Sequence, residues 1–121
     1  MKAKYNNFQD LIMWQKAHEF VLEVYKTTSK FPQSEQYGLT SQFRRAAVSV
    51  AANIAEGYKR KTKIDKGRFY LLSQSSLEEC RYYIILSRDL GYHANESLQP
   101  ILENVSMLIE SYNHKLLESG N

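Results

Sequence analysis

Residues 37–57 read YGLTSQFRRAAVSVAANIAEG, and their apolar spacing predicts an amphipathic helix from residue 39 to residue 56. The first apolar stripe of this helix consists of Leu39, Phe43, Ala46, Ala47, Val50 and Ile54. A second stripe on its flank consists of Val48, Ala51, Ala52 and Ala55. Because little polar surface remains on the C-terminal half, we expect that half to be buried on more than one side. Gly57 follows, where we expect a left-handed C-terminal cap.

The segments on both sides carry the same helical pattern. The expected helices span about residues 10–30, 39–56, 63–90 and 97–118. Thr62 and Asp65 form the pattern of a capping box that opens the third helix, and Gly91 ends it. Ser97 is the expected cap of the fourth helix, since Pro100 then falls in the first turn, where proline is tolerated.

The third helix is the longest, and its apolar residues are expected to form two buried sides. The first side repeats with a period near 3.5 and consists of Phe69, Leu72, Ser76, Cys80, Tyr83, Ser87 and Leu90. The second side consists of Leu77, Ile84 and Ile85. Four helices with short connections fold most simply as an antiparallel up-down-up-down bundle. We therefore expect an all-α protein with a single domain over residues 1–121.

Composition narrows the class of protein. Hydrophobic residues make up 43% and charged residues 24% of the 121 residues, as in ordinary globular proteins. The longest charge-free run, residues 46–55, is about half the length that crosses a bilayer, so no membrane partner is expected. The N-terminus lacks the apolar stretch of a signal peptide, and the single cysteine excludes an internal disulfide. These features favour a cytoplasmic protein, while the net charge of +3 is too small to indicate a partner.

A basic run between the second and third helices is the most unusual local feature. It consists of Lys59, Arg60, Lys61, Lys63, Lys66 and Arg68. These six residues are the candidate nucleic-acid-binding site, because lysine and arginine neutralise phosphates and the N-terminus of a helix adds partial positive charge. Tyr58 nearby could stack on bases. The alternative is a solvated connection that only keeps the protein soluble.

The outer side of the second helix is the candidate oligomer interface. One bundle core can bury only one apolar stripe well, so we expect the second stripe to pack against another copy of the chain. Two arginines on an otherwise apolar helix also need partners, and Arg45 and Glu56 are too far apart to pair within one helix. The expected interface residues are Arg44, Arg45, Val48, Ala51, Ala52, Asn53, Ala55 and Glu56. The alternative is that both arginines extend into water.

The sequence offers no set of residues for catalysis or for a cofactor. His18, His93 and His114 lie on different segments and lack the spacing of metal ligands. No nucleophile motif or phosphate loop is present, and Cys80 is interpreted as a small buried hydrophobic residue. We therefore expect a protein that is not an enzyme and that binds no metal or cofactor.

Two short motifs carry a resemblance to a known family. The segments YGLTSQ-RRAAVS at residues 37–49 and NIAEG at residues 53–57 are its most specific parts, and Asp10-Leu11 with the WQKA stretch at residues 14–17 match its start. The chain resembles the bacterial four-helix bundle proteins called 23S rRNA intervening-sequence proteins. The resemblance implies a ring-shaped homopentamer. It also implies kinship with the accessory variability protein of diversity-generating retroelements, which works with a reverse transcriptase and its RNA.

The chain departs from this family at two places. Ala51-Ala52 stand where the family commonly has Pro-Ser, so the second helix should be straighter. Ser75-Ser76 stand where the family often has Gly-Ser. We expect an oligomeric bundle that is not an enzyme and binds RNA or DNA without sequence specificity; a protein-interaction scaffold without a nucleic-acid role is the alternative.

Overall fold

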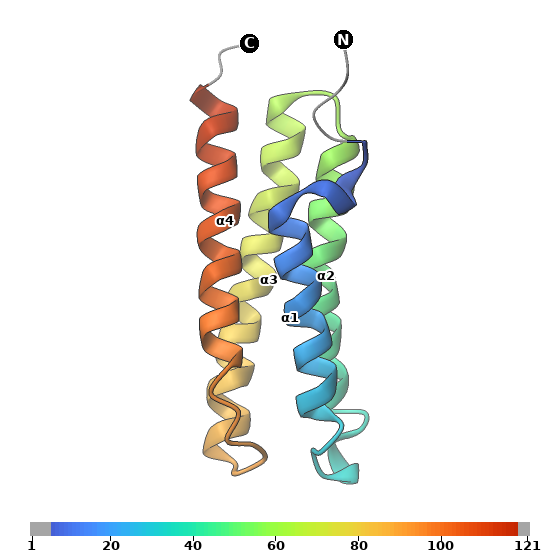
Figure 1. Ribbon diagram of the computed structural model, residues 1–121. Helices are drawn as coiled ribbons and strands as arrows, with labels where there is room; N and C mark the ends of the chain where they lie inside the picture. The colour runs from blue at the N-terminus through green and yellow to red at the C-terminus, as the bar shows by residue number, and fades with distance from the viewer. Residues whose placement is uncertain (1–5, 119–121) are drawn as a thin grey trace.

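The computed structural model describes residues 6–118, and all of their regular structure is helical (Figure 1). Residues 1–5, where no signal peptide is expected, and residues 119–121 lie outside the described part. The long helices are α1 (Ile12–Thr28), α2 (Leu39–Lys59), α3 (Lys63–Asp89) and α4 (Leu98–Glu118), with short 3-10 turns η1 (Phe8–Asp10) and η2 (Gln33–Glu35). The expected all-α fold with four helices is therefore confirmed. None of the helices in this part is long and apolar enough to span a membrane.

The four helices pack side by side as a bundle, and the ribbon turns back at each connection (Figure 1). The α2–α3 connection lies at the same end as the last turn of α4, and the other two connections lie at the opposite end. Hydrogen bonds fix the register of α2 against α3. The Ser73 hydroxyl donates to the Val50 carbonyl at 2.9 Å, and the Tyr83 hydroxyl donates to the Gln42 side chain at 3.0 Å.

The core is a single cluster along the bundle axis, and it contains the expected first stripe of α2. Its largest fully buried side chains are Tyr70, Phe20, Phe43, Leu11, Ile54, Leu77, Ile84, Leu98, Leu102, Ile109, Val24 and Val50. The second stripe of α2 divides: Ala51 is buried, Ala55 is half-buried, and Val48 and Ala52 are exposed. The small-residue flank therefore faces outward over part of its length.

Both ends of α3 have side-chain or backbone caps. At its start, the Thr62 hydroxyl oxygen accepts a hydrogen bond from the Asp65 amide at 3.1 Å, as expected of an N-cap. At its end, Gly91 has a φ of +78°. The Gly91 amide donates to the Arg88 carbonyl and the Tyr92 amide to the Ser87 carbonyl, each at 2.9 Å. This pair of bonds is the Schellman motif that stops a helix at glycine.

The expectation for Gly57 is wrong. The helix α2 continues through it to Lys59, and Gly91 is the only residue with positive φ in the described part of the chain. The cause is a contact between helices, because a Cβ atom at Gly57 would lie 2.7 Å from Cε1 of Tyr70 and 3.1 Å from Cβ of Phe69. Glycine at this position therefore permits the close approach of the Tyr70 ring.

The helix α1 is shorter at both ends than the expected 10–30. It begins at Ile12 because the preceding residues form the separate turn η1, in which the Asn7 side chain accepts from the Gln9 amide at 2.8 Å. It ends at Thr28, whose hydroxyl bonds back to the Val24 carbonyl at 2.7 Å. A serine or threonine bonded in this way competes with the regular helix ladder.

Candidate nucleic-acid interface

The α2–α3 connection places two exposed lysines beside the start of α3. Lys59 is in the last turn of α2 and Lys61 lies in the connection itself. Neither has an ion-pair partner within residues 6–118. Lys63, the first residue of α3, is half-buried and makes further interactions. The partial positive charge of the α3 N-terminus adds to these cations.

The two arginines of the basic run have acidic neighbours on their own helices. The Arg60 guanidinium bonds to the Glu56 carboxylate at 2.8 Å and lies 4.5 Å from the centre of the Phe69 ring. Arg68 approaches the Asp65 carboxylate at 3.9 Å. Exposed pairs of this kind contribute little stability and exchange readily. Counting Glu56 and Asp65 against the six basic residues gives 6 − 2 = +4, still more than the net charge of +3 for the whole chain.

Lys66 differs from the rest of the run because its ammonium group is used inside the fold. It donates to the carbonyl of Tyr58 at 2.7 Å and to that of Gly57 at 3.3 Å, and it lies 5.4 Å from the centre of the Tyr58 ring. Burial lowers the pKa of this lysine. Lys66 thus caps the last carbonyls of α2 together with the Arg60 amide, which donates to the Gly57 carbonyl at 3.1 Å, a role that the sequence pattern did not predict.

The outer face of α2 contains the residues expected at an oligomer interface, but two of them have partners within the chain. The side-chain amide of Asn53 donates to the Ser49 carbonyl at 2.9 Å and to the Ser49 hydroxyl at 3.0 Å. Glu56 is paired with Arg60, as described above. Arg45 is exposed and has no ion-pair partner in the described part of the chain. Arg45 is therefore the charged group on this face that is best placed to meet another molecule.

Arg44 also has partners, and they come from α1. Its Nε donates to the Thr28 hydroxyl at 2.7 Å, its terminal nitrogen donates to the Tyr25 carbonyl at 3.3 Å, and its guanidinium lies 4.5 Å from the centre of the Tyr25 ring. The hydrogen bonds satisfy carbonyl and hydroxyl groups near the end of α1. Arg44 thus has hydrogen-bond partners within the chain, and its place at an oligomer interface stays a prediction.

The outward face of α3 carries apolar residues that the sequence pattern did not identify as exposed. These residues are Ile64, Leu71, Leu72, Tyr82, Ile85 and Leu90. Leu72, Ile85 and Leu90 were expected in the core, but they are 47%, 44% and 49% exposed. The buried side of α3 instead consists of Tyr70, Ser73, Ser76, Leu77, Cys80, Ile84 and Ser87. Charged residues, among them Arg68, Glu78 and Glu79, lie exposed on α3 as well, so its exposed surface is mixed.

Two shallow grooves flank α2 on the same surface. One has a volume of about 440 Å³ and lies between α2 and α3, where it is lined by Arg45, Ser49, Ser76 and Glu79 among others. The other, of about 520 Å³, includes Tyr37, which is 90% exposed. Both grooves are open and are lined by polar and aromatic groups, as protein interfaces often are.

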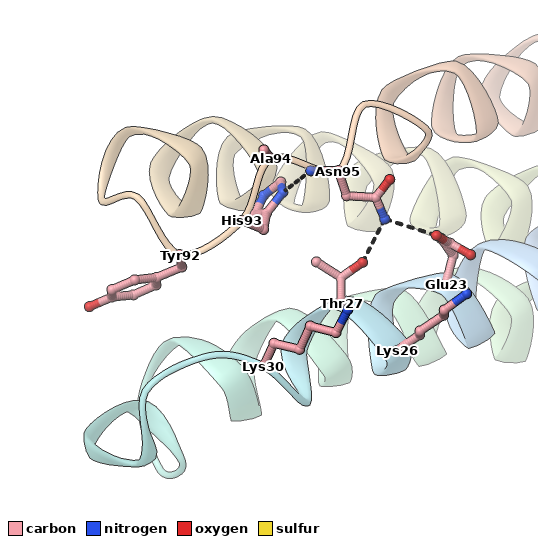
Figure 2. Close-up of a pocket in the computed structure, with 8 residues that line it drawn as sticks. All are labelled: Glu23, Lys26, Thr27, Lys30, Tyr92, His93, Ala94 and Asn95. Carbon is pink, nitrogen blue, oxygen red and sulfur yellow. Dashed lines mark hydrogen bonds between the residues drawn. The ribbon is translucent and has the colours of Figure 1, made fainter.

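A third pocket lies at the end of the bundle away from the α2–α3 connection, between α1 and the α3–α4 connection (Figure 2). Its volume is about 390 Å³, and its lining includes Glu23, Lys26, Lys30 and His93.

The other two histidines lie elsewhere and have their own contacts. His18 stacks on Trp14 with ring centres 5.0 Å apart, and His114 pairs with Glu118. Within residues 6–118 there is no group of three side chains that could hold a metal ion.

Comparison with known proteins adds one match. The family model described as 23S rRNA-intervening sequence protein matches residues 9–114. This range covers all four helices except the last turn of α4. No curated protein matches the chain.

Proposed function

The chain belongs to the 23S rRNA-intervening sequence protein family, and from this premise we propose that it is an oligomeric bundle without enzymatic activity that binds RNA or DNA through its α2–α3 connection. The family match alone indicates a small helical protein of uncertain function. The observation that carries the proposal is the pair of exposed lysines, Lys59 and Lys61, which lie beside the start of a long helix and have no ion-pair partner among the described residues. A cytoplasmic location, expected from the sequence, is part of the same proposal.

The chemistry of the α2–α3 connection suits a phosphate backbone. Ammonium groups and helix N-terminal amides attract phosphates regardless of the base attached. Arg60 and Arg68 can exchange their exposed carboxylate partners for phosphate at little cost in stability. Contacts of this kind position a strand without reading its sequence, so binding is non-specific.

The oligomeric part of the proposal rests on the outer faces of α2 and α3. Val48 and Ala52 on α2 and Leu72 and Tyr82 on α3 are all exposed, and the open groove around Arg45 lies between these helices. We propose that neighbouring up-down-up-down bundles cover these faces and close a homopentameric ring. A ring repeats the basic connection in every subunit, so weak phosphate contacts add up along one strand.

A salt-titrated binding assay with two charge-matched variants tests the nucleic-acid proposal. The first variant combines Lys59→Gln with Lys61→Gln. The control combines Lys26→Gln with Lys30→Gln, which removes two exposed lysines on or just after α1, by the pocket at the other end of the bundle. The probes are a single-stranded RNA, a structured RNA and duplex DNA.

The first variant should lose most of its affinity for all three probes, while the control should bind like the parent. On single strands, the slope of log K against log salt should shrink by about 0.7 for each phosphate that is no longer neutralised, or about 1.4 per subunit. Equal reductions of affinity in both variants would place the contact surface elsewhere. A parent that binds none of the probes near physiological salt would contradict the nucleic-acid role.

The second candidate function is a protein-interaction scaffold. The exposed apolar face of α3 favours it, since such faces mark protein contacts whether or not nucleic acid is bound. A parent that forms a stable oligomer but binds no nucleic acid would support this alternative.

Light scattering tests the oligomer separately. We expect a mass near five times the 14.1 kDa of one chain. Ala52→Glu combined with Leu72→Glu should shift the mass toward one chain, because charges replace exposed apolar groups on the outer faces of α2 and α3. Leu22→Glu, at a position on α1 that is 57% exposed, is the control and should not alter the mass. A parent with the mass of one chain would overturn this part of the proposal.

A further inference from the structure

The α3–α4 connection is tied to α1 by the side chain of Asn95 (Figure 2). The Asn95 amide nitrogen donates to the Glu23 carboxylate and to the Thr27 hydroxyl, each at 2.8 Å. The Asn95 side-chain oxygen accepts from the Ser97 amide at 2.9 Å, immediately before α4 begins. One side chain thus joins the end of α1, the connection and the start of α4.

The imidazole of His93 holds the backbone of Asn95 in place. The Asn95 amide donates to His93 Nδ1 at 3.0 Å, so Nδ1 must be unprotonated. The Ser87 hydroxyl uses its hydrogen on the Tyr83 carbonyl at 2.6 Å and is left as an acceptor for His93 Nε2 at 2.9 Å. The hydrogen-bond network therefore requires the neutral ring with its proton on Nε2.

We propose that His93 is a pH-sensitive latch, in which a proton taken up on Nδ1 breaks the bond from the Asn95 amide and releases the α3–α4 connection from α1. A proton on Nδ1 turns this acceptor into a donor that faces the N–H donor of Asn95. Both groups then lack an acceptor unless the connection moves. The pocket of about 390 Å³ beside the ring gives the connection room and gives water access.

The surroundings of His93 favour the closed latch at neutral pH. Its ring stacks on that of Phe31, which is buried, with centres 6.1 Å apart. Burial lowers the pKa of His93 below its ordinary 6.5 and the charge of Arg88 lowers it further, while a hydrogen bond to the Ile84 carbonyl opposes both effects. The other titratable and charged groups around this pocket are Glu23, Lys26, Lys30 and Tyr92, with Glu35 bonded to the Tyr92 hydroxyl.

The sign of the pH dependence follows from this lowered pKa. The folded chain binds the proton less readily than the unfolded chain does, so the latch contributes its full stability above pH 6.5. That contribution is lost as the pH falls through the lowered pKa of His93. Glu23 remains ionised over this range. The hydrogen bond that its carboxylate accepts from the Asn95 side chain is the main cause that lowers its pKa below the ordinary 4.5.

Amide hydrogen exchange of the full chain between pH 7.5 and pH 5 tests the latch. The protection factors of the Asn95 and Ser97 amides should fall in the parent, by about tenfold for each pH unit below the pKa of the folded chain. Protection in the middle of α2 should stay constant, which distinguishes local release from unfolding. In His93→Gln, the protection factor of the Asn95 amide should no longer fall between pH 7.5 and pH 5. In His114→Gln and in Glu23→Gln, this fall should remain.

A second measurement on the parent does not depend on any variant folding. The ¹⁵N shifts of the His93 ring at pH 7.5 should show the proton on Nε2, and its titration should have a midpoint below 6.5. A proton on Nδ1 at pH 7.5 would overturn the latch. Asn95 protection that does not change with pH in the parent, or a step that persists in His93→Gln, would also overturn it.

Discussion

Replacing Gly57 with alanine tests the close contact between α2 and α3. Two effects of opposite sign compete at this position. Alanine is about 1 kcal/mol more favourable than glycine inside a helix. Its Cβ, however, would lie 2.7 Å from Cε1 of Tyr70 and 3.2 Å from Cδ1, in a ring that is only 1% exposed. Overpacking a buried site costs about 1–3 kcal/mol, so we expect Gly57→Ala to destabilise the fold by about 1 kcal/mol.

Gly67→Ala is the matched control for this prediction. Gly67 also lies within a helix, but a Cβ there would meet only the side-chain oxygen of Asn113 at 3.4 Å, an ordinary contact distance. Gly67→Ala should therefore stabilise the protein by about 0.5–1 kcal/mol through helix propensity. The two variants carry the same chemical change and should move the melting temperature in opposite directions.

Thermal unfolding followed by circular dichroism measures both effects. A change of 1 kcal/mol shifts the melting temperature by about 4 °C for a domain of this size. All variants must be compared at one protein concentration, because association stabilises the folded state. In a Tyr70→Leu background, the cost of Gly57→Ala should shrink or vanish. A Gly57→Ala variant that gains as much stability as Gly67→Ala would refute the contact.

Three other predictions concern single side chains. Lys66→Met should lower the stability by about 1 kcal/mol, because the Tyr58 carbonyl loses the ammonium donor and the Gly57 carbonyl keeps only the Arg60 amide. It should reduce nucleic-acid affinity less than Lys59→Gln does, and a larger loss of affinity than that of Lys59→Gln would contradict the structural role. Arg44→Met should destabilise the fold by about 1–2 kcal/mol in denaturant titrations through loss of its bonds to α1, and an unchanged midpoint would mean that those bonds contribute nothing. The Cys80 thiol, whose pKa burial raises to about 12, should react with a thiol reagent at pH 8 only as fast as the chain opens, so rapid labelling of the folded protein would disprove its burial.

The helical class and the four-helix content followed from local signals in the sequence. The Thr62 cap depends on a hydroxyl and an amide three residues apart, so the sequence around it contains all the information required. The left-handed turn at Gly91 is similarly local. The first stripe of α2 was also predicted correctly, because apolar residues at helical spacing define the buried face wherever the partner helix lies.

The errors arose where the outcome depends on a distant residue. Gly57 could serve as a cap or as a contact site, and only the position of Tyr70 decides between them. In α3, Ser73 and Ser87 are fully buried, while Leu72 and Leu90 are exposed, so apolar residues lie on both the buried side and the outward face. An interpretation based on hydrophobicity alone therefore assigned Leu72 and Leu90 to the wrong face.

The candidate site was only partly accessible from the sequence for the same reason. The basic run is visible as a series of charges, but the sequence does not show which charges are already used. The separation of Lys66 from Lys59 and Lys61 depends on carbonyls at the end of α2 and on the path of the connection. Arg44 likewise has partners on α1, sixteen and nineteen residues away.

The close contact between Gly57 and the Tyr70 ring also sets the register of α2 against α3. One turn earlier on α2 stand Asn53 and Ile54, which carry side chains where Gly57 has none. A slip of α2 along α3 by one turn would bring these side chains toward the Tyr70 ring, so the glycine favours one register of the two helices. That register fixes where α2 ends relative to the start of α3, and it therefore sets the path of the short connection that carries Lys61.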